Sequence, residues 1–278
     1  MADFVNGWLY EAGIGETRAM RLENGELIQI RAERTDGRAR AGAVVEAKFT
    51  RQWVSGRSGI ITLADGQEAL LQPLPKGLTE GSMVRVEIVR AAMTERGGQA
   101  KTGRIDFEGG RLLVSLTPAM TLFDVDGPLA PFELAKRAAK EIALALVRFD
   151  ISGNIGVDFP TLQAKAERAA VTAIFDEYMT ANCERTAING FGFMQIVSRK
   201  LRPSVLEIMQ ANRSVNAALQ LLRQAERDRG TGAMRLDVHP AVANKMQPML
   251  LEELARRTGR PVSVEPRGEV SIDGGSTG

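Results

Sequence analysis

The chain has 278 residues, of which 44% are hydrophobic, and its formal net charge is +2. This length can bury the cores of two or three modules, and a mildly basic charge permits a nucleic-acid partner. The single cysteine, Cys183, excludes an intramolecular disulfide framework and a multi-cysteine zinc site. No run approaches the roughly eighteen apolar residues of a membrane span, and the N-terminus shows no basic-then-apolar leader. We therefore expect a cytoplasmic protein that has no membrane partner.

Residues 1–36 are predicted to form a short β segment. The alternating runs Thr17–Leu22 and Glu26–Arg31 flank Asn24-Gly25, and this dipeptide between two such runs is a strong hairpin signal. A further run, Gly7–Glu11, precedes them across a glycine-rich bend. We expect an N-terminal hairpin segment that packs against the rest of the chain.

Residues 37–104 alternate short strands with glycine turns, a spacing that is typical of a small β-barrel. The expected strands are Ala43–Trp53, Gly59–Ala64, Glu68–Leu71 and Met83–Ala91. Barrels of the OB type bind oligonucleotides on one face. The basic residues near the start of this segment are Arg31, Arg34, Arg38, Arg40, Lys48, Arg51 and Arg57. A solvated surface is the alternative explanation for them, because charged runs are common on soluble proteins.

Residues 105–207 carry two short apolar runs, Leu112–Leu116 and Met120–Val125, that indicate buried strands. The run Pro131–Phe149 is apolar at helical spacing, and a third apolar run covers Asn154–Phe159. The expected unit is therefore strand, helix and parallel strand with a right-handed crossover.

Two aspartates stand where the parallel strands of this unit end. Parallel strands bring their carboxyl ends to one edge of a sheet, so Asp124 and Asp158 should converge there although they are far apart in sequence. Such an edge is where open α/β sheets hold ligands. The competing role for each aspartate is to start a turn or to cap the following helix.

Three motifs in this unit resemble the catalytic core of the ribonuclease E/G family. Residues 123–127 read F-D-V-D-G where the family has I-D-V-N-S-G, residues 138–143 read A-A-K-E-I-A, and residues 157–159 read V-D-F. The resemblance implies a deoxyribonuclease-I-like mixed α/β catalytic unit. It also implies that Asp124 and Asp158 are catalytic residues that hold Mg²⁺, or Mn²⁺ in its place. Asp126 stands where the family has asparagine and is a third candidate ligand.

The resemblance extends to the barrel, which in the family is an OB-fold RNA-binding domain. Ile60 and Leu70 occupy the two places where family members usually present aromatic side chains to RNA. Base stacking is therefore weakened or moved, with Trp53 as the candidate. Lys101 lies near the family's RNA-contacting lysine, and we expect Arg51 and Arg57 to neutralise phosphates.

The next expected elements are a helix and two strands, Pro160–Thr180, Arg185–Ile188 and Phe193–Val197. Residues 192–204 resemble the family's F-G-L-x-E-x-S-R-x-R-x-x-P-S segment. Arg199, Lys200 and Arg202 are therefore candidate phosphate-binding residues beside the carboxylates, because cations stabilise the charge on a transferring phosphoryl group. An ordinary solvated basic turn is the other interpretation.

Residues 208–267 resemble the small αβ domain of the family, and residues 268–278 are expected to be a flexible tail. The expected elements are Ser214–Arg227 and Pro240–Thr258 as helices, and Ala233–Val238 and Pro261–Glu265 as strands. No cysteine pair is present where the large family members bind zinc, so we expect no structural zinc and no zinc-linked dimer, and the oligomeric state stays open. His239 precedes Pro240 and is expected to be a cap or a surface residue rather than a general base.

The predicted fold class is multidomain α+β or α/β. No residues are left between the barrel and the catalytic unit for the family's 5′-phosphate-sensing domain, so the resemblance is to a minimal member. It implies a magnesium-dependent endoribonuclease, a hydrolase that cuts single-stranded RNA during processing or decay and leaves 5′-phosphates. A catalytically silent RNA-binding or chaperone protein is the alternative, and a structural protein that uses its sheet edge is a third hypothesis.

Overall fold

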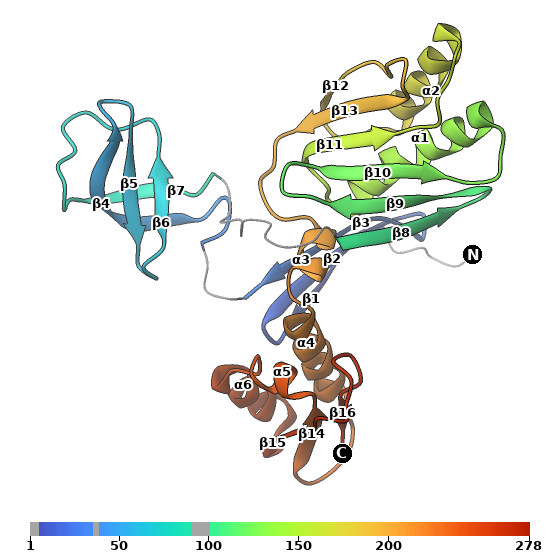
Figure 1. Cartoon of the computed structure of the whole chain (residues 1–278). Helices are drawn as coiled ribbons and strands as arrows, with labels where there is room; N and C mark the ends of the chain where they lie inside the picture. Colours follow the sequence, from blue (N-terminus) through green and yellow to red (C-terminus); the bar gives the residue numbers. More distant parts are fainter. Residues whose placement is uncertain (1–5, 36–38, 90–100) are drawn as a thin grey trace. The chain divides into compact units, whose positions relative to one another are not determined.

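The computed structural model describes residues 6–35, 39–89 and 101–278, with the side chains of Lys101 and Thr102 excepted. The described residues fall into two compact units. The smaller unit contains residues 39–89 together with Lys200–Arg202, and the larger unit contains the others. The chain is mixed α and β, with several sheets (Figure 1).

The larger unit begins with an antiparallel sheet of order β1-β2-β3. Its strands are Gly7–Gly13, Glu16–Glu23 and Glu26–Arg34. Asn24 and Gly25 between β2 and β3 both have positive φ, 52° and 81°, which matches the right-handed twist of a two-residue hairpin. The predicted N-terminal hairpin is confirmed.

A six-stranded sheet of order β12-β13-β11-β10-β9-β8 is the largest sheet of the larger unit (Figure 1). In chain order its strands, β8 to β13, are Lys101–Phe107, Gly110–Leu116, Thr121–Asp126, Gly153–Asp158, Glu184–Arg185 and Phe193–Ser198. The pair β10 and β11 is parallel, and all other neighbours are antiparallel. The predicted strand, helix and parallel strand are therefore confirmed.

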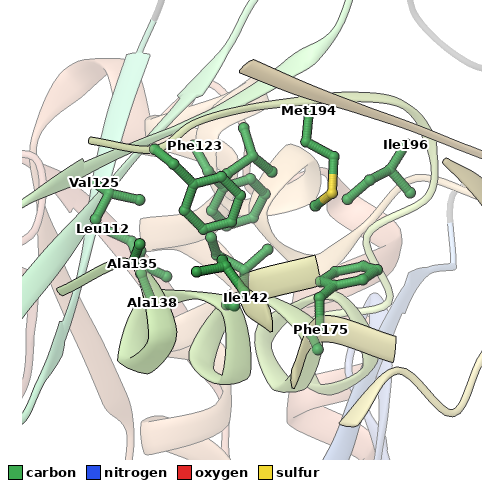
Figure 2. Close-up of a cluster of buried hydrophobic side chains, with 14 of the residues drawn as sticks. Leu112, Phe123, Val125, Ala135, Ala138, Ile142, Phe175, Met194 and Ile196 are labelled. Atoms are coloured by element: carbon green, nitrogen blue, oxygen red, sulfur yellow. The ribbon is translucent and has the colours of Figure 1, made fainter. Parts of the chain in front are cut away.

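Helices α1 (Pro131–Arg148) and α2 (Lys165–Tyr178) cover one face of this sheet. Pro131 occupies the first helical turn, where its missing N–H costs nothing, and the apolar side of α1 recurs every three or four residues. Figure 2 shows the resulting core, in which buried side chains from the sheet and both helices pack together. The labelled members are Leu112, Phe123, Val125, Ala135, Ala138, Ile142, Phe175, Met194 and Ile196. The opposite face of the sheet bears exposed polar side chains such as Asp124 and Gln195 together with partly exposed apolar ones such as Leu122 and Val197.

Helix α2 begins at Lys165, five residues after the predicted start at Pro160. The intervening residues run without regular structure, and Arg168 Nη1 donates to the carbonyl oxygens of Leu162 and Gln163 at 2.6 and 2.9 Å. The side chain of an α2 residue therefore satisfies the backbone of the segment that precedes the helix.

The smaller unit is an antiparallel sheet of order β6-β5-β4-β7. Its strands β4 to β7 are Val44–Val54, Ser58–Leu63, Glu68–Leu71 and Met83–Glu87. The core is small, with Ala47, Phe49 and Ile61 buried. The first three predicted strands of this segment are confirmed within one residue at each end, whereas the strand predicted over Met83–Ala91 ends at Glu87, and residues 90–91 lie outside the described residues. The predicted boundary at residue 104 falls too late, because strand β8 already begins at Lys101, which pairs with Leu116 in the six-stranded sheet.

The C-terminal part of the larger unit packs helices on a three-stranded sheet of order β15-β14-β16. Its helices α3 to α6 are Val205–Ala211, Arg213–Glu226, Pro240–Ala243 and Pro248–Thr258. Its strands β14 to β16 are Met234–Val238, Val262–Pro266 and Ser276–Thr277.

Three details of this region differ from the prediction. The helix expected over Pro240–Thr258 is two helices, because Pro248 starts a new one. Helix α3 was not predicted; Ser204 starts it with a capping box to Glu207. The predicted flexible tail at 268–278 is wrong, because β16 pairs with β14 and Arg213 Nε donates to Asp273 at 2.8 Å.

His239 is confirmed as a cap, since its Nδ1 accepts a hydrogen bond from the backbone N–H of Ala241 at 3.0 Å. Among the helices of the described residues, none is long and apolar enough to cross a membrane.

Candidate active site

The two predicted catalytic aspartates lie side by side. Asp124 on β10 and Asp158 on β11 are directly paired in the parallel register. Neighbouring strands are about 4.8 Å apart, so the two carboxylates leave the sheet as close neighbours. Both side chains are exposed, whereas Phe123 and Val157, one residue earlier on each strand, are buried. Alternation along the strands therefore places the carboxylates on the face opposite the helices.

The environment of Asp124 opposes its ionisation. The pKa of its carboxyl is raised, first by burial and then by the negative charges of Asp158 and Asp126. A cation between the carboxylates would remove this repulsion. The electrostatics thus fit a cation held by Asp124 and Asp158.

Asp126 differs from the other two aspartates because Arg111 binds it. The two residues are paired across β9 and β10, and Arg111 Nε donates to Asp126 Oδ2 at 2.8 Å. A second nitrogen of the same guanidinium, Nη2, donates to the same oxygen. As a metal ligand Asp126 would have to compete with this cation. Sequence reasoning missed Arg111, and only the β9–β10 register identifies it as the partner.

Within residues 6–35, 39–89 and 101–278, no three histidine, cysteine or acidic side chains gather in the manner of a closed metal site. Mg²⁺ does not need such a group, because it usually takes one or two protein carboxylates and keeps several waters. The paired oxygens of Asp124 and Asp158 suit that hard cation.

The predicted position of Arg199 beside the carboxylates is wrong. Strand β13 runs antiparallel to β11, with Phe193 paired to Asp158 and Ser198 paired to Gly153. Arg199 follows Ser198 and leaves the sheet where β11 begins, which is about 17 Å from Asp158 at roughly 3.4 Å per residue. Lys200 and Arg202 are grouped with the smaller unit. Of these three residues, the strand register places Arg199, which is not at the carboxylate edge of the sheet.

The start of β13, and not its end, lies at the carboxylate edge. A Cβ built on Gly156 would lie 2.7 Å from Phe193 Cζ, 2.8 Å from Leu122 Cδ2 and 3.0 Å from Met120 Sδ. The Phe193 ring thus covers Gly156 on the same face as Asp158, and apolar atoms border the carboxylates.

Four of the predicted RNA-binding residues gather on one face of the smaller unit. Arg51 pairs with Ile60 across β4 and β5, and Ile60 pairs with Leu70 across β5 and β6. The Arg51 guanidinium lies 5.9 Å from the centre of the Trp53 ring, and Trp53 and Leu70 are 64% and 57% exposed. Arg51 also approaches Glu68 at 3.5 Å. We call Arg51, Trp53, Ile60 and Leu70 the Trp53 row.

Besides Arg199, Lys200 and Arg202, two more predicted RNA-binding residues are not part of this row. Arg57 is exposed in the turn between β4 and β5. The backbone of Lys101 belongs to the six-stranded sheet, and its side chain lies outside the described part of the chain.

In comparisons with known proteins, the chain matches no family model and no curated protein.

Proposed function

We propose that the protein is a minimal ribonuclease of the E/G type, a metal-dependent endoribonuclease that hydrolyses single-stranded RNA. The observation that carries the proposal is the in-register pair Asp124 and Asp158 at the carboxyl ends of parallel strands, on the open face of the sheet. Ligands of open α/β sheets bind at such an edge. The deoxyribonuclease-I-like character of this sheet is part of the proposal.

In this proposal Asp124 and Asp158 hold the metal and fix its place against the scissile phosphate. Bound Mg²⁺, or Mn²⁺, would supply an activated water and neutralise charge on the phosphate. Water adds to phosphorus and the bond to the 3′-oxygen breaks, which leaves a 3′-hydroxyl and a 5′-phosphate. The buried neighbours Phe123 and Val157 hold both strands in register.

Arg111 limits the negative charge that an approaching RNA meets. Its guanidinium binds Asp126, so of the three neighbouring aspartates only Asp124 and Asp158 face the substrate without this cation. Asp126 therefore contributes less repulsion of a phosphate than its sequence position suggests.

The smaller unit supplies the RNA-binding surface in this proposal. We assign it to the OB type because short antiparallel strands carry the exposed Trp53 row beside basic residues. Aromatic faces stack on any base, and guanidinium groups contact phosphates. This division of roles gives binding with little base specificity.

The decisive experiment incubates the full chain with a labelled unstructured RNA, with Mg²⁺ or with chelator. We expect internal cleavage that requires the metal and leaves 5′-phosphates. Asp124→Asn and Asp158→Asn should each abolish cleavage, because a neutral isostere removes metal affinity and keeps the volume. Cleavage at the parent rate by either variant would refute the site.

Asp106→Asn is the matched control. Asp106 is an exposed aspartate on the same face of the sheet, paired across strands with Arg111 and hydrogen bonded to Arg104 at 2.7 Å. It is remote from β11 in the strand order, so we expect parent activity.

A second candidate is a catalytically silent RNA-binding or chaperone protein. The observation in its favour is that the Trp53 row lies in a unit of its own, which needs no carboxylates to bind RNA. RNA binding with no cleavage in Mg²⁺ or Mn²⁺ would favour this candidate over the nuclease.

A further inference from the structure

The turn between β12 and β13 carries an exposed aromatic residue that nothing above explains. Phe191 is 85% exposed, the highest value among the large hydrophobic side chains of the described residues. Exposure of a whole phenyl ring contributes nothing to folding, because the ring stays in water. The side chain is therefore available to a partner.

Phe191 is held on a fixed backbone. The Oδ1 atom of Asn189 accepts hydrogen bonds from the backbone N–H groups of Phe191 and Phe193, at 2.9 and 3.0 Å. The N–H of Gly192 closes the turn by donating to the carbonyl of Asn189 at 3.2 Å. The ring of Phe191 is thus presented with its backbone already ordered, which lowers the entropic cost of binding.

This turn is joined to the residue that follows Asp158. The N–H of Phe159 donates to the carbonyl of Gly192 at 3.1 Å. Gly192 has φ of +93°, and a Cβ there would lie 2.2 Å from the carbonyl oxygen of Phe159, so only glycine allows the approach. The turn is therefore fixed at the carboxylate edge of the sheet.

The spacing between Phe191 and the carboxylates suits an RNA strand. Asp158 and Phe193 are cross-strand partners, about 5 Å apart at their Cα atoms. Phe191 is two residues earlier, at most about 7 Å of chain further. Its Cα thus lies within roughly 12 Å of that of Asp158, within reach of a base that neighbours a phosphate at the carboxylate pair.

We propose that Phe191 stacks on a nucleobase next to the scissile phosphate and so positions the RNA strand over Asp124 and Asp158. The inference rests on the proposed function and adds a base-stacking residue to its active site. An aromatic face accepts every base, so this contact favours unpaired strands without selecting a sequence. The Phe193 ring over Gly156 extends the apolar surface from the turn to Asp158.

The test measures binding of a labelled single-stranded RNA by fluorescence anisotropy in chelator, where no metal supports cleavage. Phe191→Ala should weaken binding roughly tenfold, equivalent to about 1.4 kcal/mol, and Phe191→Tyr should retain it. The melting temperature of Phe191→Ala should equal that of the parent, since the ring is exposed. A fully base-paired RNA should bind parent and Phe191→Ala equally, because its bases are already stacked.

Phe191→Trp reports the contact directly, because stacking on a base quenches indole fluorescence. The fluorescence change of the parent, which comes from Trp8 and Trp53, is subtracted from that of the variant. Tyr10→Ala is the matched control, since Tyr10 is 69% exposed but lies on β1, outside the six-stranded sheet. We expect quenching by single-stranded RNA in Phe191→Trp beyond the quenching of Trp53 in the parent, and no loss of affinity for Tyr10→Ala.

The results separate this inference from the nuclease proposal. A parent that binds and cuts RNA together with an unchanged Phe191→Ala would overturn the inference and leave the nuclease standing. A parent that binds without cutting removes the nuclease, and tenfold weaker binding by Phe191→Ala would then still support the stacking contact. Unchanged RNA affinity with a changed sedimentation coefficient would make Phe191 a contact between protein copies and overturn the inference.

Discussion

Replacing Glu16 by glutamine should destabilise the larger unit by about 3 kcal/mol. Glu16 is 3% exposed at the start of β2, and its carboxylate accepts from Arg18 Nε and Arg34 Nη1 at 2.5 Å and from Arg223 Nη2 at 3.1 Å. Arg223 belongs to α4, so this carboxylate joins the N-terminal sheet to the C-terminal helices. Burial, followed by the charge of Arg18, lowers the pKa of Arg223, and the charge of Glu16 opposes that shift.

The magnitude follows from the solvent contact or the partner that each arginine retains, which for Arg34 is Asn216 Oδ1. Breaking a buried ion pair costs about 3–5 kcal/mol, because an uncompensated charge stays buried. Arg18 is 38% exposed and can turn to water, and Arg223 still has Glu11 at 3.8 Å. These remaining partners place the cost at the lower end of that range. A loss of about 3 kcal/mol corresponds to a melting temperature lower by roughly 6–12 °C for a unit of this size.

Scanning calorimetry of the full chain measures the transition of the larger unit, and the difference should persist in high salt because the ions are buried. Glu11→Gln is the control: Glu11 contacts Arg223 and Arg227, but its side chain is 37% exposed, so we expect a loss below about 1 kcal/mol. If the Glu16→Gln and Glu11→Gln proteins had the same melting temperature, the assignment of Glu16 as the centre of this network would be refuted.

Two further predictions concern the candidate sites. Asp126→Asn should retain cleavage. The acid limb of its pH profile should move to lower pH, because the substitution removes one of the charges that raise the pKa of Asp124. Complete loss of cleavage would instead make Asp126 a metal ligand. Replacing Arg51 and Arg57 together should weaken binding of poly-U and poly-A alike and reduce the slope of log K against log salt by roughly one unit or more. Fluorescence anisotropy in an Asp158→Asn background measures both quantities. An unchanged slope would mean that the RNA binds elsewhere.

The sequence was sufficient for features that depend on local pattern and on parallel connection. The convergence of Asp124 and Asp158 was predictable because a helical crossover between two neighbouring strands of one sheet is typical of a parallel pair, and a parallel pair brings both carboxylates to one edge. Arg199 was misplaced because the direction of β13 is set by its pairing with β11, and an antiparallel strand reverses which end meets the carboxylates.

Features that depend on tertiary pairing left weaker signals. Strand β16 has two residues, and only its partner β14 makes it a strand. Pro248 was visible in the sequence, but the pattern around it did not indicate that one helix ends before it and another begins at it. Phe191 was missed because an apolar residue in a turn indicates nothing until its exposure and the docking of Gly192 on Phe159 are known.

The raised pKa of Asp124 predicts opposite effects of one substitution on activity and on stability. A carboxyl whose pKa is higher in the folded state than in the unfolded state contributes stability that is fully present below its ordinary pKa and is lost as pH rises through the folded value. At neutral pH the ionised Asp124 therefore opposes folding. Asp124→Asn removes that charge, so the variant should be at least as stable as the parent at pH 7 while cleaving no RNA.

The stability difference between this variant and the parent should shrink as pH falls toward the ordinary pKa of aspartate, because protonation neutralises the parent carboxyl as well. Melting curves of both proteins between acid and neutral pH measure it. Since the carboxylate is partly exposed, the effect is small, and its sign is the informative quantity. A variant that is less stable than the parent at neutral pH would mean that Asp124 supports the fold. The aspartate would then be a structural residue at the end of its strand, and the case for a cation site at this edge would fail with it.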